Sequence, residues 1–120
     1  MRGDQPVLHR VTSAVHCDLA VNPLTIEAQV QGGGMVQGLG MTLPGARITL
    51  KDGVVQQSSW HDYRLAAHGH MPSQVSVHIV PSADPPTGVG EPGVPPLAPA
   101  LANAVAALTG NRLRSLPFVA

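Results

Sequence analysis

Residues 87–96 (TGVGEPGVPP) constrain the backbone more than any other stretch of the chain. Three glycines and three prolines surround a single acid, Glu91. Because proline fixes φ and removes an amide donor, this segment cannot form an ordinary helix or a central strand. Glycine in turn lets another group approach the main chain closely. The stretch is therefore predicted to be a rigid loop that presents one carboxylate.

The residues alone allow two interpretations of Glu91. A carboxylate on a rigid, weakly polar loop is expected to be poorly solvated, and this is one way in which a general base is poised near neutral pH. The alternative is a solvated surface turn with an exposed Glu, and composition alone favours this second interpretation.

A glycine-rich stretch follows a predicted helix start. Asn22 can cap a helix and Pro23 suits its first position. Residues 31–40 then contain five glycines, each of which would cost about 1 kcal/mol relative to Ala inside a helix. Either this segment is a loop, or its glycine face lies against another backbone or a planar cofactor. A phosphate-binding loop is not predicted, because the Lys-Ser/Thr ending is missing.

The rest of the chain predicts short strands and a second helix. Alternation indicates strands over residues 7–15 and 75–80, and Asp52-Gly53 is typical of a hairpin turn. An alanine-rich helix is expected after Pro95-Pro96, with Gly110 as its stop. Its apolar stripe consists of Leu97, Leu101, Val105 and Leu108. The expected fold class is α+β, with a small mixed β-sheet, a Gly-rich helix and a C-terminal Ala-rich helix in one domain over residues 1–120.

Composition and charge exclude several classes of function. Seven basic and seven acidic side chains balance one another, so neither nucleic acid nor an anionic membrane is an expected partner. The single Cys17 excludes an internal disulfide and a cysteine-held iron–sulfur cluster. No apolar run of about 20 residues is present, so no membrane span is predicted. His16-Cys17 and His68 with His70 are interpreted as structural, because neither pair has a further ligand at metal-site spacing. His61-Asp62 could be a small catalytic cluster but is interpreted as structural, because neighbours in a strand point to opposite sides and would not act on one substrate together.

Residues 88–93 (GVGEPG) and 95–100 (PPLAPA) resemble the active-site loop near the C-terminus of molybdenum hydroxylase large subunits. This is the xanthine dehydrogenase and aldehyde oxidase family, and the residues most resemble its isoquinoline 1-oxidoreductase β-subunit/aldehyde dehydrogenase branch. The similarity covers nearly the whole chain. In the family, the glutamate of this motif is the base that deprotonates the molybdenum-bound hydroxyl, and it falls on Glu91. The resemblance implies that Gly88 and Gly90 let the loop approach the metal centre.

Residues 28–33 (AQVQGG) and 37–40 (QGLG) resemble the pterin-contacting helix of the same family. The pterin-binding glutamine of the family falls on Gln29, whose amide supplies both a donor and an acceptor. The chain departs from the family pattern by one extra glycine between Gln31 and Met35. One added residue rotates a helix by about 100°, so Gln37 would leave the face of Gln29 unless a bulge absorbs the residue.

The resemblance implies a C-terminal molybdopterin-binding segment of a larger oxidoreductase subunit. That enzyme would hydroxylate aldehydes or N-heterocycles with water as the oxygen source. The implied cofactor is molybdopterin with molybdenum, as its cytosine dinucleotide. The implied partners are the remainder of the large subunit and a [2Fe–2S] subunit, in either cytoplasm or periplasm. Because cofactor sites bury most of their ligand, we expect the chain alone to be inactive.

Two other hypotheses remain open. The chain could be a non-catalytic truncated fragment or small binding module that keeps the fold, or a soluble α+β domain of unrelated function. Co-expression with the missing large-subunit segment would separate the enzyme hypothesis from the fragment hypothesis, since only the enzyme hypothesis expects molybdenum to be restored.

Overall fold

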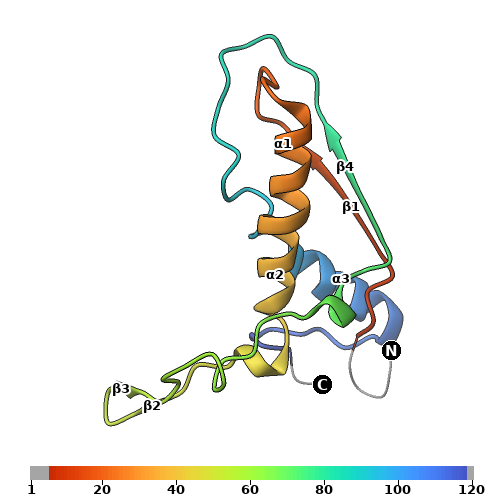
Figure 1. Ribbon diagram of the computed structural model, residues 1–120. Helices are drawn as coiled ribbons and strands as arrows, with labels where there is room; N and C mark the ends of the chain where they lie inside the picture. The colour runs from red at the N-terminus through yellow and green to blue at the C-terminus, as the bar shows by residue number, and fades with distance from the viewer. Residues whose placement is uncertain (1–5, 119–120) are drawn as a thin grey trace.

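The computed structural model describes residues 6–118 and arranges them around one long helix (Figure 1). Three consecutive segments make up this helix: α1 (Pro23–Ala28), a π-helix (Gln29–Val36) and α2 (Gln37–Gly40). The other regular elements are β1 (Arg10–Val15), β2 (Leu50–Lys51), β3 (Val54–Val55), β4 (Gln74–Ile79), α3 (Leu97–Thr109) and two 3-10 turns, Pro44–Ala46 and His68–His70. Each of the predicted helices and strands is therefore present, although β2 and β3, which flank the predicted hairpin turn, have only two residues each.

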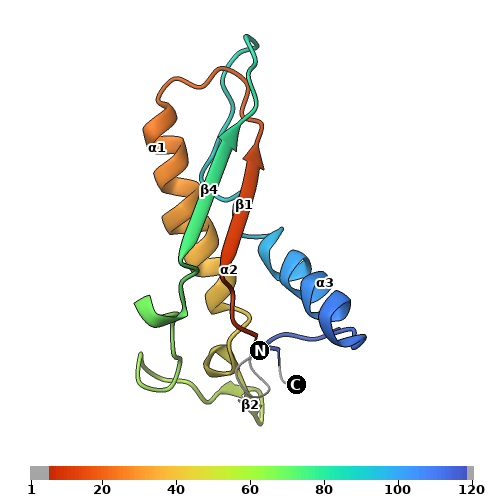
Figure 2. The ribbon, with the colours of Figure 1, turned by 90° about the vertical axis from the view of Figure 1, so that its right-hand side faces the viewer.

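The strands form two separate sheets. β1 and β4 are parallel, in a register that runs from the Arg10–Gln74 pair to the Val15–Ile79 pair. Figure 2 shows these two strands side by side, with the long helix along them. β2 and β3 pair antiparallel at the tip of a projecting arm (Figure 1). The α+β class is confirmed, but the single mixed sheet that we expected is wrong, because the hairpin extends away from the parallel pair.

The long helix begins as its sequence predicts. The side-chain oxygen of Asn22 accepts a hydrogen bond from the backbone N–H of Thr25 at 3.2 Å, and Pro23 is the first helical residue. The glycines do not interrupt the helix; instead it widens into the π-helix over Gln29–Val36. Such a widening accommodates additional residues within a continuous helix. It is the kind of bulge that the extra glycine was expected to require.

The glycine face of this helix lies against another backbone, as one of our two interpretations required. A Cβ added to Gly34 would lie 2.6 Å from the Cα of Gly93. One added to Gly38 would lie 3.0 Å from both the carbonyl oxygen of Val94 and the Cβ of Leu97. Residues 87–96 are thus packed so closely on the helix that side chains at these positions would push the loop away.

Two hydrophobic clusters stabilise the fold. The first fills the space between the long helix and the parallel strands and comprises Val15, Cys17, Ile26, Val30 and Met35. The second joins α2, α3 and the C-terminal tail and comprises Leu39, Leu97, Leu101, Val105 and Phe118. Leu108, which we predicted in the apolar stripe of α3, is 69% exposed. That prediction is wrong because the last turn of α3 extends beyond the elements on which the helix packs.

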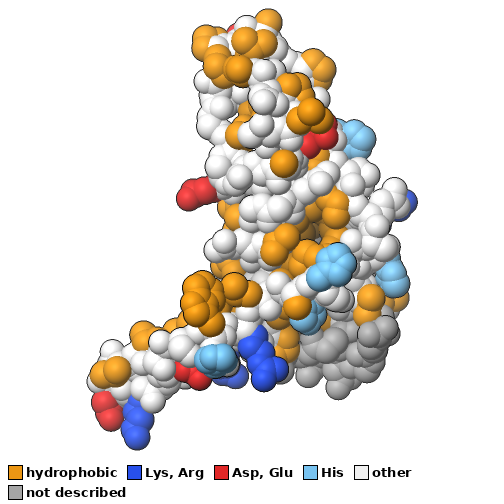
Figure 3. All heavy atoms as spheres, viewed as in Figure 1, with side chains coloured by type: hydrophobic (Ala, Val, Ile, Leu, Met, Phe, Trp, Pro, Cys, Tyr) orange, Lys and Arg blue, Asp and Glu red, His pale blue; other side chains and the backbone are white. Residues whose placement is uncertain are grey.

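The molecule is elongated, and its arm exposes apolar side chains. The radius of gyration is 16.2 Å, against about 14 Å for a compact chain of this length. Figure 3 shows hydrophobic side chains along the arm, and Trp60 there is 77% exposed. Among the residues that the structure describes, no helix is long and apolar enough to cross a membrane.

Gly110 ends α3 with a φ of +79°, and the change Gly110→Ala tests this stop. A Cβ there would meet no atom within 4 Å, so the only penalty is the left-handed backbone, which costs an L-residue about 1–2 kcal/mol. We expect urea denaturation to show a loss of unfolding free energy of that size. Gly69→Ala is the control, because Gly69 has the same free space without a positive φ. Equal stability of the two variants would contradict this account.

Candidate functional site

One hydrogen bond joins the two stretches that the sequence singles out. The side-chain amide nitrogen of Gln29 donates to the carbonyl oxygen of Gly90 at 2.7 Å, across 61 positions of sequence. Gln29 is half-buried on the long helix, and Gly90 is exposed in the loop. The bond therefore places the predicted pterin-contacting residue directly beside the residue that precedes Glu91.

Glycines make this contact possible. A Cβ on Gly33 would lie 2.5 Å from the amide nitrogen of Gln29, so a larger residue there would displace the Gln29 side chain from this position. Close contact between the backbones of Gly34 and Gly93 then sets the height of the loop above the helix. Sequence reasoning missed the positioning roles of Gly33, Gly34 and Gly93. The glycine spacing indicated that another group lies close to the helix, but not which segment of backbone it is.

One backbone hydrogen bond ties the start of the loop to another segment, and a second closes a turn within it. The N–H of Thr87 donates to the carbonyl oxygen of Cys17 at 3.1 Å, which ties the loop to the chain just beyond β1. The N–H of Val94 donates to the carbonyl oxygen of Glu91 at 2.9 Å, closing a turn around the acid. The predicted loop conformation is confirmed, and the position of the Glu91 backbone follows from it.

The side chain of Glu91 is exposed. Within residues 6–118 its carboxylate makes no side-chain hydrogen bond or ion pair. The expectation of a poorly solvated carboxylate is therefore not met by this chain, because the helix covers the loop from one side only. Glu91 is a surface acid, as the alternative interpretation held, but on a loop whose position the helix fixes.

The surface around Glu91 is rich in bare backbone. A Cβ added at Gly88 or Gly90 would meet nothing within 4 Å. The amide oxygen of Gln29 has no hydrogen-bond donor within residues 6–118, so it can still accept one. A flat group whose edge carries donors and acceptors could approach this surface without a steric barrier. Gln37 is exposed and makes no side-chain hydrogen bond in the described part of the chain.

Two other titratable residues, Cys17 and Asp62, have structural surroundings. No group of three or more His, Cys, Asp or Glu residues within the described chain could hold a metal ion. Cys17 is buried in the first hydrophobic cluster. Asp62 accepts hydrogen bonds from the backbone N–H of Ser58 at 3.1 Å and from its hydroxyl at 2.9 Å. Both bonds hold the pKa of Asp62 below its usual value, and the bond from the backbone N–H has the larger effect. The side chain of Asp62 thus stabilises a turn.

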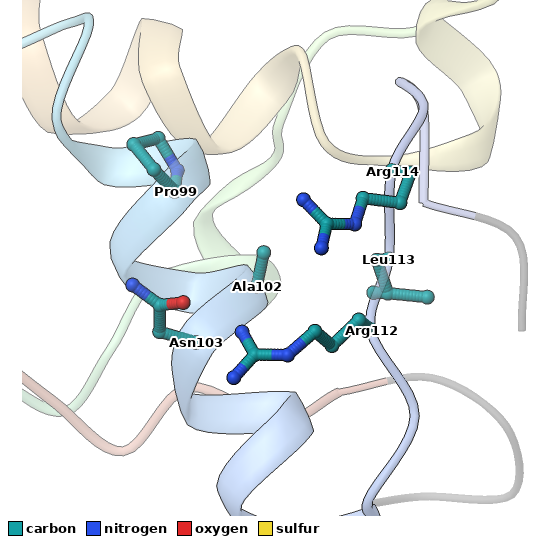
Figure 4. Close-up of a pocket in the computed structure, with 6 residues that line it drawn as sticks. All are labelled: Pro99, Ala102, Asn103, Arg112, Leu113 and Arg114. Atoms are coloured by element: carbon teal, nitrogen blue, oxygen red, sulfur yellow. The ribbon is translucent and has the colours of Figure 1, made fainter.

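Cavities formed by other described residues include one larger and one smaller example. The larger, about 850 Å³, involves α2, the neighbouring 3-10 turns and the residues before β1. The smaller, about 170 Å³, lies between α3 and the C-terminal tail (Figure 4). Neither is lined by Gln29 or Glu91. The candidate site is therefore an open face of the chain rather than a closed pocket.

The change Gln29→Ala tests whether the helix holds the loop. It removes a hydrogen bond of the kind that contributes about 1 kcal/mol, and we expect the Val94 amide to exchange with solvent roughly fivefold faster. The measurement is hydrogen–deuterium exchange of the metal-free chain. Gln37→Ala is the matched control on the same helix, because that side chain makes no hydrogen bond within residues 6–118. Unchanged Val94 exchange in Gln29→Ala would show that the bond does not restrain the loop.

Comparison with known proteins places this surface in a family. Residues 5–72 match the family model of the molybdopterin cofactor-binding domain. The β subunit of isoquinoline 1-oxidoreductase from Brevundimonas diminuta is 38% identical over 91% of the chain and 14% of that protein. A nicotinate dehydrogenase subunit from Pseudomonas putida is 28% identical over 99% of the chain and 10% of that protein. A putative xanthine dehydrogenase molybdenum-binding subunit from Escherichia coli is 32% identical over 92% of the chain and 15% of that protein.

The chain spans between 10% and 15% of the length of these relatives. Its match to the domain model covers more than half of its own residues. With that match and the similarity to these subunits, the chain belongs to the molybdopterin cofactor-binding domain family of the molybdenum hydroxylases.

Proposed function

We propose that this chain forms one wall of the molybdenum cofactor site in an oxidoreductase that hydroxylates aldehydes or N-heterocycles, with water as the oxygen source. The observation that carries this proposal is the 2.7 Å hydrogen bond between Gln29 and Gly90. It unites, on one surface, an amide suited to a pterin edge and the loop that bears Glu91. Two of the relatives are named for isoquinoline and nicotinate, which supports an N-heterocyclic substrate.

The residues present fit one face of the cofactor. Gln29 uses its amide nitrogen to hold the loop and keeps its amide oxygen for a donor on the pterin. Gly88 and Gly90 present bare backbone, and a Cβ added at either would meet no atom within 4 Å, so a flat ring can approach them closely. Molybdopterin, as the cytosine dinucleotide, supplies the redox-active molybdenum when it is bound.

Glu91 acts as the general base. A carboxylate oxygen of its side chain takes up the proton that the oxygen nucleophile loses as it attacks the electron-poor carbon of the substrate. The loop contributes by holding the backbone beside Glu91 next to Gln29, and such positioning of a catalytic group favours proton transfer. Exposure of Glu91 within this chain means that other polypeptide must exclude water from it.

Several features of the chain support a partner polypeptide. Cofactor sites bury most of their ligand's surface, whereas the face around Glu91 is open. Trp60 and Leu50 on the arm are exposed apolar side chains, and such surfaces are typical of contacts between chains. The remainder of a large subunit would cover these surfaces, and a [2Fe–2S] subunit would accept the electrons. The chain by itself is inactive under this proposal.

The experiment that tests the proposal is co-expression of this chain with the missing large-subunit segment and the iron–sulfur subunit. Metal analysis of the purified complex is expected to find about one molybdenum per complex, and none in the chain alone. Oxidation of aldehydes by the purified chain alone, with a dye as acceptor, would refute the proposal. If neither a complex nor bound molybdenum forms, the alternative holds: a small binding module that keeps the fold without the chemistry.

A further inference from the structure

The C-terminal tail runs beside α3 (Figure 4). Leu113 is half-buried and packs against the second hydrophobic cluster. Arg112 and Arg114, one residue to either side, extend from the tail toward α3 (Figure 4). Leu113 lines the same cavity as the two arginines. The packing of Leu113 therefore anchors the part of the tail that carries both arginines beside α3.

Both arginines line the smaller cavity. It has a volume of about 170 Å³, and Asn103 lines it from the α3 side. No acidic residue lines it. The one ion pair within residues 6–118 joins His16 to Asp18, so neither guanidinium is neutralised by a carboxylate of the described chain. Two positive charges thus line one small cavity without a counter-charge from the described residues.

We propose that Arg112, Arg114 and Asn103 form a binding site for a phosphate group. A guanidinium presents donors in a planar fork that matches phosphate oxygens, and the Asn103 amide offers a further donor. A phosphate monoester carries a charge of about −1.5 to −2 at neutral pH, which balances two arginines, whereas a carboxylate balances only one. Charge complementarity therefore favours phosphate as the ligand.

The phosphate can be free or the terminal group of a larger ester, because Arg112, Arg114 and Asn103 are all exposed to solvent. The site lies on the tail side of α3, and neither Gln29 nor Glu91 lines it. The inference does not depend on the proposed function, since phosphate binding needs no molybdenum. The metal-free chain can test it, and its failure would leave the proposed function untouched.

The test is an NMR titration of the full 120-residue chain at low salt with inorganic phosphate, with pyrophosphate and with acetate. We expect saturable shifts of the Asn103 side-chain amide and of the backbone amides of residues 112–114. Phosphate and pyrophosphate are expected to bind at least about tenfold more tightly than acetate. Tighter binding of pyrophosphate than of phosphate would indicate a site for the terminal phosphate of a larger ester. Tighter binding of phosphate would indicate a site for the free ion.

Variants decide whether these arginines carry the binding. Arg112→Gln and Arg114→Gln are each expected to weaken phosphate binding at least about tenfold, and Arg114→Lys less, because it keeps the charge but loses the fork. Arg47→Gln, an exposed arginine that does not line the cavity, is expected to bind as the parent chain does. Phosphate binding that is retained in Arg114→Lys would show that a change at this position does not by itself unfold the chain. No saturable phosphate binding, equal binding in the Gln variants, or acetate binding as tightly as phosphate would overturn the proposal.

Discussion

Replacing Glu91 with Gln in the assembled enzyme is expected to lower kcat by at least about 10²-fold, the contribution usual for a general base. Gln keeps the size and polarity of the side chain but cannot accept the proton. Molybdenum content should stay the same, because the contacts that fit the cofactor belong to Gln29 and the loop backbone. The measurement pairs steady-state turnover of an aldehyde or N-heterocycle, with a dye acceptor, with metal analysis of the same sample.

Glu27→Gln is the matched control for this prediction. Glu27 is the only other glutamate of the chain, and it lies on α1, so the same chemical change there should leave turnover unaffected. If Glu91→Gln retained full turnover with molybdenum bound, Glu91 would not be the base. Loss of molybdenum in that variant would instead assign Glu91 to cofactor retention.

Features with a purely local cause could be predicted from the sequence. Asn22 caps the long helix through its own side chain, and Gly110 ends α3 because it tolerates a positive φ. Asp52 and Gly53 both adopt positive φ, which fixes the predicted hairpin turn between β2 and β3. Each of these outcomes depends on the conformational preference of one or two residues, which the sequence states directly.

Features that depend on distant contacts could not be predicted in this way. Alternation indicated β1 and β4 but not that they pair with each other and leave the hairpin in a separate sheet. Helical spacing marked Leu108 as part of a buried stripe, but burial also requires something to cover it. The strand pairing and the burial of Leu108 both depend on which distant segments lie beside these elements. Periodicity carries no information about that.

The candidate site also combines features that the sequence indicates with features that depend on distant contacts. Resemblance to a family pointed to Gln29, Gly88, Gly90 and Glu91, and the catalytic and cofactor-binding roles of these residues remain predictions. The hydrogen bond from Gln29 to Gly90 could not be foreseen, because it depends on the closeness of two backbones far apart in sequence. Solvation of Glu91 was misjudged for a related reason: a rigid loop excludes water only when it is covered on both sides.

Gly34→Ala is expected to lower the free energy of unfolding of the chain by about 1–3 kcal/mol, the usual cost of overpacking. The added Cβ would lie 2.6 Å from the Cα of Gly93. Because the obstacle is backbone and not a movable side chain, either the helix or the loop must shift. Ala is preferred over Gly in a helix by about 1 kcal/mol, so a net loss would mean that the steric contact outweighs that preference. Urea denaturation provides the measurement.

The control makes the same substitution two positions earlier. A Cβ on Gly32 meets no atom within 4 Å, so Gly32→Ala should raise the free energy of unfolding by up to about 1 kcal/mol. Opposite signs in the two variants would show that the Gly34–Gly93 contact requires glycine. A stabilising Gly34→Ala would contradict the close packing. If Gly34→Ala also speeds exchange of the Val94 amide, the contact that holds the helix to the loop also positions Glu91.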